Sequence, residues 1–283
     1  MSDERSGERV VLAFPGQGSH EEGMRDVVAR WRPELLDTLA AVAGDDAFER
    51  AEASTAAAQP AIVCASVAHW HARGCPRGEW AIGHSLGELT ALVAAGSLDE
   101  HDAVRLAARR GQLMQEASDA HPGCGMLAAK AAVDDVAPIA EELGVAVGNN
   151  NAPNQVVLSG SAEQLDRARE RLKEAGIRST RLRVAGAFHS PLMASAVEPL
   201  RAALAEIEFS PPACVVFSPI SVAPMEDPRR ELPDSLLSPV RWVEAVQALA
   251  DGGAERFEEI GPGGVLTRLI ELSLSDVFDR AAD

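Results

Sequence analysis

The short segment Gly83–Glu88, GHSLGE, constrains the fold of this chain more than any other. It follows the apolar run WAI and precedes LTALVAAGSL, a run typical of a buried helix. Glycine two residues before and two residues after Ser85 permits a tight turn from a strand directly into a helix. Either Ser85 caps that helix, or it is a nucleophile presented on the turn. Both interpretations predict a strand–turn–helix unit.

Further strand and helix patterns on both sides of this segment predict a large α/β domain around a mostly parallel sheet. Residues 9–19 have the pattern of a buried strand that ends in a glycine loop. The other expected elements of this domain are helices over 59–74, 99–118, 190–207 and 238–253, a strand over 213–220, and a strand, glycine turn and final helix over 256–272.

Residues 123–186 follow a different order, β-α-β-β-α-β, which is typical of a ferredoxin-like unit. The expected strands cover 125–131, 145–150, 155–160 and 177–184, and the expected helices cover 133–144 and 161–176. We therefore predict a ferredoxin-like insert at 123–186, within a catalytic domain formed by 1–122 and 187–283.

The net charge of −17 argues against nucleic acid as a partner, because a chain this acidic repels polyanions. No apolar stretch approaches the roughly 20 residues that span a bilayer, and the start MSDERSGERV has no signal-peptide pattern. The four cysteines are scattered and form no C-x-x-C pair, so we expect reduced thiols, no metal site and a cytoplasmic location.

A serine nucleophile needs a base within hydrogen-bond reach and donors directed at the developing oxyanion. The turn itself offers one donor, the backbone N–H of Leu86. Among the seven histidines, His189 in GAFHSP follows Ser85 in chain order, as in hydrolase-type turns. His84 adjoins Ser85, but neighbouring side chains in such a turn point apart. The residues alone leave His189 open as either the base or an ordinary residue at a helix start.

Seven motifs along the chain now indicate a family. FPGQGS, GHSLGE, RRGQLMQEA, NNNAPNQVVLSG, GAFHSPLM, SPVRW and IGPGGVLTRL occur in this order between about residues 10 and 272. The chain thus resembles malonyl-CoA:acyl-carrier-protein transacylases and the acyltransferase domains of polyketide synthases. The resemblance implies an α/β-hydrolase-like large domain with a ferredoxin-like small inserted domain.

The same resemblance implies the catalytic roles. Ser85 resembles the acylated nucleophile, and His189 resembles its base. The backbone N–H groups of Gln17 and Leu86 would form the oxyanion hole. Arg110 resembles the arginine that pairs with the free carboxylate of a malonyl group, which is suited to a bidentate guanidinium. From the residues alone, Arg110 is equally well a surface arginine.

Other positions are implied to shape the site. The backbone carbonyl of Arg241, in SPVRW, would orient the base. His84 and the asparagines Asn149 and Asn151 would line the cleft, although asparagines also form turns without further function. Phe188, directly before His189, resembles the residue of malonyl-specific members and would crowd a 2-methyl group.

The implied reaction is ping-pong transfer from malonyl-CoA to the phosphopantetheine thiol of an acyl carrier protein, with no permanently bound cofactor and with a monomeric enzyme.

Arg178, Arg181 and Arg183 could dock the carrier protein, or could equally protect an exposed strand edge from pairing with another strand. The segment over 32–59 is about ten residues shorter than the family pattern, which affects the cleft rim. Alternatives are an acyl-carrier-protein hydrolase, transfer of an unusual acyl group between carrier proteins, and a non-enzymatic scaffold.

Overall fold

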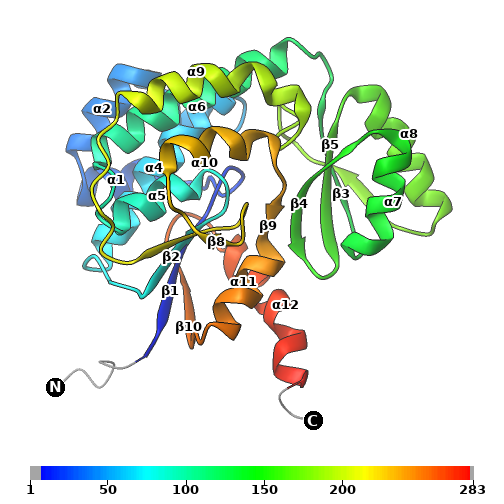
Figure 1. The fold of residues 1–283 in the computed structure, drawn as a ribbon. Helices are drawn as coiled ribbons and strands as arrows, with labels where there is room; N and C mark the ends of the chain where they lie inside the picture. The colour runs from blue at the N-terminus through cyan, green and yellow to red at the C-terminus, as the bar shows by residue number, and fades with distance from the viewer. Residues whose placement is uncertain (1–7, 281–283) are drawn as a thin grey trace.

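The computed structural model describes residues 8–280, which form two five-stranded sheets with helices around them (Figure 1). The strands are β1 Val10–Phe14, β2 Trp80–Gly83, β3 Gly125–Ala129, β4 Ala146–Ala152, β5 Gln155–Gly160, β6 Ser179–Arg181, β7 Val215–Ser218, β8 Ala223–Pro224, β9 Val240–Arg241 and β10 Arg256–Glu259. The helices are α1 Met24–Trp31, α2 Glu34–Ala43, α3 Ala47–Arg50, α4 Thr55–Ala72, α5 Gly87–Ala94, α6 Glu100–Asp119, α7 Val133–Leu143, α8 Ala162–Glu174, α9 Ala194–Ala205, α10 Pro228–Asp234, α11 Trp242–Asp251 and α12 Val265–Arg280, with 3₁₀ turns η1 Pro191–Met193 and η2 Ser235–Leu237. The expectations for residues 1–7 and 281–283 lie outside the described residues.

The first sheet has the order β10-β1-β2-β7-β8, and its first four strands run parallel. Only the two-residue edge strand β8 is antiparallel. The carboxyl ends of parallel strands meet at one edge of a sheet, which is where ligands bind in open α/β folds. The loop after β1 and the turn after β2 are therefore neighbours, and this brings FPGQGS and GHSLGE together. The predicted α/β architecture is confirmed.

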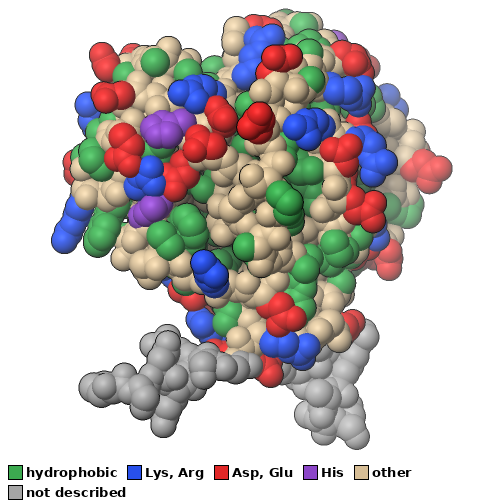
Figure 2. Space-filling view, turned by 60° about the vertical axis from the view of Figure 1, so that its left-hand side comes forward, with side chains coloured by type: hydrophobic (Ala, Val, Ile, Leu, Met, Phe, Trp, Pro, Cys, Tyr) green, Lys and Arg blue, Asp and Glu red, His purple; other side chains and the backbone are tan. Residues whose placement is uncertain are grey.

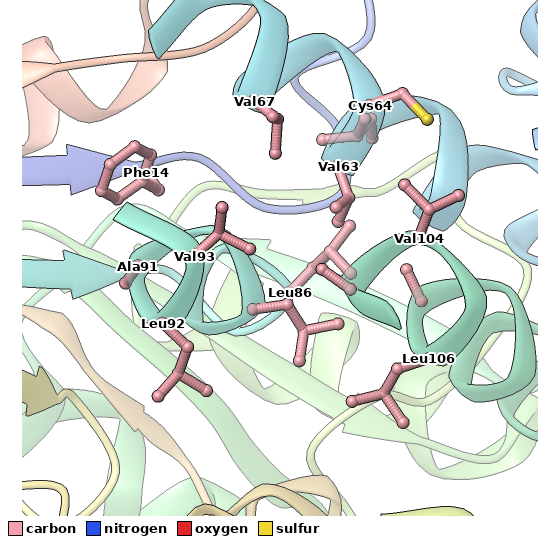
Figure 3. Packing of buried hydrophobic residues seen from close by; sticks show 14 of the residues in the cluster. Phe14, Val63, Cys64, Val67, Leu86, Ala91, Leu92, Val93, Val104 and Leu106 are labelled. Atoms are coloured by element: carbon pink, nitrogen blue, oxygen red, sulfur yellow. The ribbon is translucent and has the colours of Figure 1, made fainter. Parts of the chain in front are cut away.

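Helices cover both faces of this sheet because strands such as β1 carry apolar side chains on both faces. The side chains of β1 alternate, so Leu12 and Phe14 enter one core with α4, α5, α6 and α9, while Val11 and Ala13 enter a second core with α11 and α12. Figure 3 shows the first core, where Phe14 lies near the α5 side chains and Leu86 faces α4 and α6. Because both faces are buried, β1 is apolar throughout, VVLAF.

The second sheet has the order β6-β3-β5-β4-β9 and is antiparallel, except for the short β4–β9 pair. Helices α7 and α8 pack on it through a small core that includes Leu127, Leu158 and Leu165 (Figure 1, right). A capping box opens α8, in which Ser161 and Gln164 bond reciprocally to backbone N–H groups. The predicted β-α-β-β-α-β order is present over these residues, and β9 adds a strand from later in the chain.

Several expected elements differ in extent, and the clearest cases are α4 and β6. Helix α4 begins at Thr55, capped by Ser54, so Pro60 lies inside the helix and not near its start. The strand expected over 177–184 is ordered as β6 over only three residues. The Leu182 N–H still donates to the Met126 carbonyl of β3 at 2.9 Å, and the side chains of Leu182 and Val184 line the cavity described below. Among the described residues, no helix has the length and apolar character needed to cross a membrane.

Candidate active site

The turn after β2 holds Ser85 in a conformation that few residues adopt. Its φ is 53°, in the left-handed region. The glycines on either side are required sterically, since a Cβ at Gly83 would lie 2.0 Å from the backbone N of Glu88, and one at Gly87 would lie 2.1 Å from the backbone O of Phe14. Ser85 does not cap α5, because Leu86 occupies the cap position and no side chain bonds there. The structure therefore favours the interpretation of this turn as one that presents Ser85.

His189 meets Ser85 across a separation of 104 residues. Its Nε2 lies 2.9 Å from Ser85 Oγ. On the other side of the ring, Nδ1 lies 2.9 Å from the carbonyl oxygen of Ser235 and 3.0 Å from that of Ser238. Because carbonyl oxygens only accept hydrogen bonds, we assign the proton to Nδ1, which leaves the Nε2 lone pair facing the serine hydroxyl.

The imidazole of His189 is neutral in this setting. Burial and, to a smaller extent, the positive charge of Arg110 lower its pKa to about 3, although the two carbonyl contacts partly oppose these effects. A neutral ring with its lone pair toward Ser85 Oγ is the form that accepts a proton.

The expected orienting group for His189 was wrong. The Arg241 carbonyl is not the acceptor, since the acceptors are the carbonyls of Ser235 and Ser238. Ser235 begins η2 and Ser238 directly follows it, and the Ser235 carbonyl also accepts a hydrogen bond from the Ser238 N–H at 3.3 Å. Arg241 lies in β9, where its N–H donates to Pro219 and its guanidinium pairs with Glu244. Ser238 opens the SPVRW motif, so the motif was the right one but the position was three residues too late.

Arg110 is the second side chain on the Ser85 hydroxyl. One guanidinium nitrogen donates to Ser85 Oγ at 3.0 Å, and another donates to Gln59 Oε1 at 2.9 Å. The residue is 4% exposed, and among the described residues no carboxylate oxygen lies within 4.0 Å of it. By contrast, Arg105 pairs with Asp102 and Arg109 donates to Gln112 at the surface. Only Arg110 of these three arginines faces the site.

A cavity of about 310 Å³ opens above Ser85, His189 and Arg110. Apolar side chains form much of its wall, among them Met114, Met126 and Phe188. Phe188 is buried, and its ring fits because residue 186 is glycine, where a Cβ would lie 2.6 Å from the ring. Among the described residues, no group of three or more His, Cys, Asp or Glu side chains is placed to hold a metal ion.

A family model for the acyl transferase domain matches residues 11–282, nearly the whole chain. The chain belongs to this acyltransferase family. It is 37% identical over 284 residues to the malonyl CoA-acyl carrier protein transacylase of Escherichia coli, and the match covers 92% of this chain and 91% of that protein. It is also 33% identical to the polyketide biosynthesis protein ThaF of Burkholderia thailandensis, of which it covers 24%.

Solved structures agree with this placement. The malonyl-CoA:acyl carrier protein transacylase of Xanthomonas oryzae is 36% identical, with a TM-score of 0.85 and coverage of 94% of this chain and 91% of that one. A malonyl-transacylase solved in complex with its acyl carrier protein from a type II polyketide synthase is 34% identical, also with a TM-score of 0.85, and the match covers 94% and 93% of the two chains.

The acyltransferase site also contains a cluster of three polar side chains that connects the two sheets of the protein. His84 Nε2 lies 2.8 Å from Asn151 Oδ1 and 3.5 Å from Asn149 Nδ2, both on β4. The His84 ring packs against Trp242 at 5.3 Å between ring centres, and burial lowers the pKa of His84. His84 and both asparagines line the cavity, and their contacts fix β4 beside the serine turn.

The two expected oxyanion donors lie at the ends of adjacent strands. Gln17 follows β1, and Leu86 follows β2 and Ser85. In the described part of the chain, neither backbone N–H donates a hydrogen bond. Gln17 lines the cavity, while the Leu86 side chain points away into the first core.

Sequence reasoning missed Gln59, which is fully buried on α4. Its oxygen accepts from Arg110, and its amide nitrogen lies 3.2 Å from Met114 Sδ and 3.4 Å from Gln17 Oε1. Gln59 therefore ties the arginine to the loop that carries Gln17. The signal for it was a single uncharged amide in a run of alanine and aliphatic residues, AAAQPAIVCA, where a buried amide needs a partner.

Proposed function

We propose that this acyltransferase moves a malonyl group from malonyl-CoA to the phosphopantetheine thiol of an acyl carrier protein, by way of a malonyl ester of Ser85. The observation that carries the proposal is Arg110, a buried guanidinium beside Ser85 Oγ with no carboxylate partner among the described residues. An unpaired buried cation is costly unless the ligand supplies the opposite charge. A malonyl thioester supplies one carboxylate, two carbons from the reacting carbonyl.

In the first half-reaction, Ser85 Oγ attacks the thioester carbonyl while its proton moves to His189 Nε2, 2.9 Å away. The negative oxygen of the tetrahedral intermediate accepts hydrogen bonds from the N–H groups of Gln17 and Leu86. When the C–S bond breaks, the CoA sulfur leaves with the proton held by His189. The products are CoA thiol and the seryl ester.

The second half-reaction reverses these roles. The carrier-protein thiol gives its proton to His189 Nε2, and its sulfur attacks the ester carbonyl. The C–O bond to Ser85 then breaks, and the serine oxygen recovers the proton from His189. The carbonyls of Ser235 and Ser238 hold Nδ1–H throughout, so the ring keeps the tautomer that the reaction needs.

Malonyl binding also increases the basicity of His189. The charge of Arg110 is one of the causes that lower the pKa of His189. A carboxylate paired with Arg110 offsets that charge, so the pKa of His189 rises when the dicarboxylate half-thioester is bound. An acetyl group does not have this effect. Selection of the malonyl group and activation of Ser85 thus depend on the same guanidinium.

We further propose that Phe188 disfavours 2-methylmalonyl groups. Its ring lines the cavity beside Met126, and one methyl group typically changes selectivity by ~1–3 kcal/mol. For docking, Arg178, Arg181 and Arg183 are exposed on or near β6; Arg181 donates to the Gly123 carbonyl at 2.6 Å and lies 3.9 Å from Asp166. On the face in Figure 2, acidic and basic side chains are instead interspersed. We propose the β6 arginines as a contact for an acidic carrier protein.

The two sheets support a finer description of the fold. We propose an α/β-hydrolase-like catalytic domain over 1–122 and 187–283, with a ferredoxin-like insert over 123–186. The small core of the second sheet draws only on residues inside 123–186, which supports that division. Monomeric action and a cytoplasmic location stay predictions.

The mass of the intact protein tests the proposed function. We would incubate it with malonyl-, methylmalonyl- and acetyl-CoA, and compare Ser85→Ala with the control Ser221→Ala, which changes an exposed serine. A malonyl adduct that Ser85→Ala loses and Ser221→Ala keeps, and that a carrier protein discharges, supports the proposal. Rapid release of free malonate, without an adduct or transfer to the carrier protein, would favour a hydrolase instead.

A further inference from the structure

Glu88 is a buried carboxyl group that none of the steps above uses. It lies three residues after Ser85, in the first turn of α5, and is 1% exposed. Its Oε1 accepts a hydrogen bond from the Ser218 hydroxyl at 2.9 Å. Its Oε2 has no hydrogen-bond partner within the described residues. A buried carboxyl with one unsatisfied oxygen is rare enough to require an explanation.

The charged groups whose fields reach Glu88 are Arg110 from α6 and Glu231 from α10. The strands packed against α5 carry no titratable side chain, since β1 reads VVLAF, β2 reads WAIG and β7 reads VVFS. In the buried part of α4, the titratable group is Cys64, and burial raises the pKa of that thiol, which stays protonated. Arg110 is therefore the only cation acting on Glu88, and no ion pair within 4.0 Å joins the two in the described structure.

These surroundings decide the charge of Glu88. Burial raises its pKa to about 8, and the Ser218 hydroxyl and the Arg110 charge only partly oppose that effect. At pH 7 the group is therefore mostly a neutral acid. Above pH 8 it becomes a carboxylate in the field of Arg110.

We propose that Glu88 is a positioning residue that sets acyl-group selectivity through Arg110: as a neutral acid it leaves the guanidinium available to the malonyl carboxylate, and as a carboxylate it competes with that ligand. This inference rests on the proposed function, in which Arg110 holds the malonyl carboxylate. It adds a residue that touches no reacting atom and that makes selectivity depend on pH.

The direction of the pH effect follows from linkage. A bound malonyl carboxylate adds negative charge near Glu88 and offsets Arg110, so the pKa of Glu88 is higher in the complex than in the free enzyme. Malonyl binding is therefore strongest below pH 8 and weakens as the pH rises above it. An acetyl group has no carboxylate, so its binding does not respond to Glu88 in this way.

The test is the ratio of kcat/KM for malonyl-CoA to that for acetyl-CoA, measured by competition for Ser85 acylation between pH 7 and pH 9. A ratio cancels pH effects that both substrates share, and His189, whose pKa is about 3, does not titrate in this range. With a free-enzyme pKa of about 8, the wild-type ratio should fall by up to about tenfold over this range. The range ends at pH 9 because burial lowers the pKa of Arg110 to about 10.

Two variants separate this role from a structural one. Glu88→Gln keeps an acceptor for Ser218 but cannot ionise, so its ratio should stay constant from pH 7 to pH 9. Ser218→Ala removes the hydrogen bond that lowers the pKa of Glu88, so the fall in its ratio should begin at a higher pH than in the wild type. Circular dichroism verifies that each variant is folded.

The outcomes are distinct. A wild-type ratio that does not change with pH overturns the role of Glu88 while leaving malonyl transfer intact, and so does an equal fall in Glu88→Gln. If Glu88→Gln does not fold, the Ser218→Ala variant tests the proposal instead. A malonyl-to-acetyl ratio that falls at the same pH in Ser218→Ala as in the wild type overturns the proposal. Absence of any malonyl ester on Ser85 in the wild type would instead reject the proposed function, and the inference with it.

Discussion

Arg110→Ala gives the sharpest test of how the site selects its acyl group. The variant removes both the donor to Ser85 Oγ and, among the described residues, the only buried cation beside it. Breaking a buried charge pair costs about 3–5 kcal/mol, because the remaining charge stays buried without a partner. Since each 1.36 kcal/mol corresponds to a factor of ten, kcat/KM for malonyl-CoA should fall roughly 100- to 5,000-fold. An acetyl group has no carboxylate that would lose its partner in Arg110→Ala, so kcat/KM for acetyl-CoA should change far less.

The assay is a competition between malonyl-CoA and acetyl-CoA, with acylated Ser85 read by mass at short times. Arg109→Ala is the matched control, because Arg109 is the preceding residue of the same helix and donates only to Gln112. In the control the malonyl preference should be retained. A change of less than about fivefold in the Arg110→Ala ratio would show that the guanidinium does not hold the malonyl carboxylate, since even one hydrogen bond to a charged group is worth ~1.5–3 kcal/mol.

Three other predictions concern residues around the same site. Gln59→Leu leaves an Arg110 N–H buried without an acceptor, so the malonyl-to-acetyl ratio should fall by about tenfold in the competition assay, and an unchanged ratio would reject the positioning role of Gln59. Phe188→Ser should raise the ratio of methylmalonyl to malonyl acylation by roughly 10- to 100-fold, and a constant ratio would place the selectivity elsewhere. Gly87→Ala puts a Cβ 2.1 Å from the Phe14 carbonyl oxygen, so thermal unfolding should show a loss of at least ~1–3 kcal/mol of stability, and a wild-type melting temperature would contradict this packing.

The serine turn could be predicted from the sequence because its requirements are local. Two glycines and a short apolar strand define the turn between β2 and α5, and the steric distances at Gly83 and Gly87 explain why no other residue fits there. The partner of Ser85 could not be derived in the same way. His189 lies 104 residues away, and its place after Ser85 in the chain made it a candidate base, but only the family resemblance assigned it that role.

The errors and omissions that concern the site involve contacts between distant segments. Which carbonyl orients His189 depends on where η2 ends, and a motif does not specify that to within three residues. Gln59 and Glu88 lie in runs of small and aliphatic residues, where a helical pattern predicts burial but not a partner. Their roles follow only from the position of Arg110, which the sequence could not distinguish from Arg105 and Arg109.

The charge state of this site explains why His189 is oriented by two carbonyls and not by a carboxylate. Within residues 8–280, Arg110 is the one buried charge beside Ser85, because His189 is neutral and Glu88 is mostly protonated at pH 7. A carboxylate next to His189 would add a permanent negative charge near Arg110 and would compete with the substrate for it. The Ser235 and Ser238 carbonyls fix the imidazole without that charge. The site therefore carries one positive charge when empty and becomes neutral when an acyl group with a single carboxylate binds, which is the property that distinguishes malonyl from acetyl.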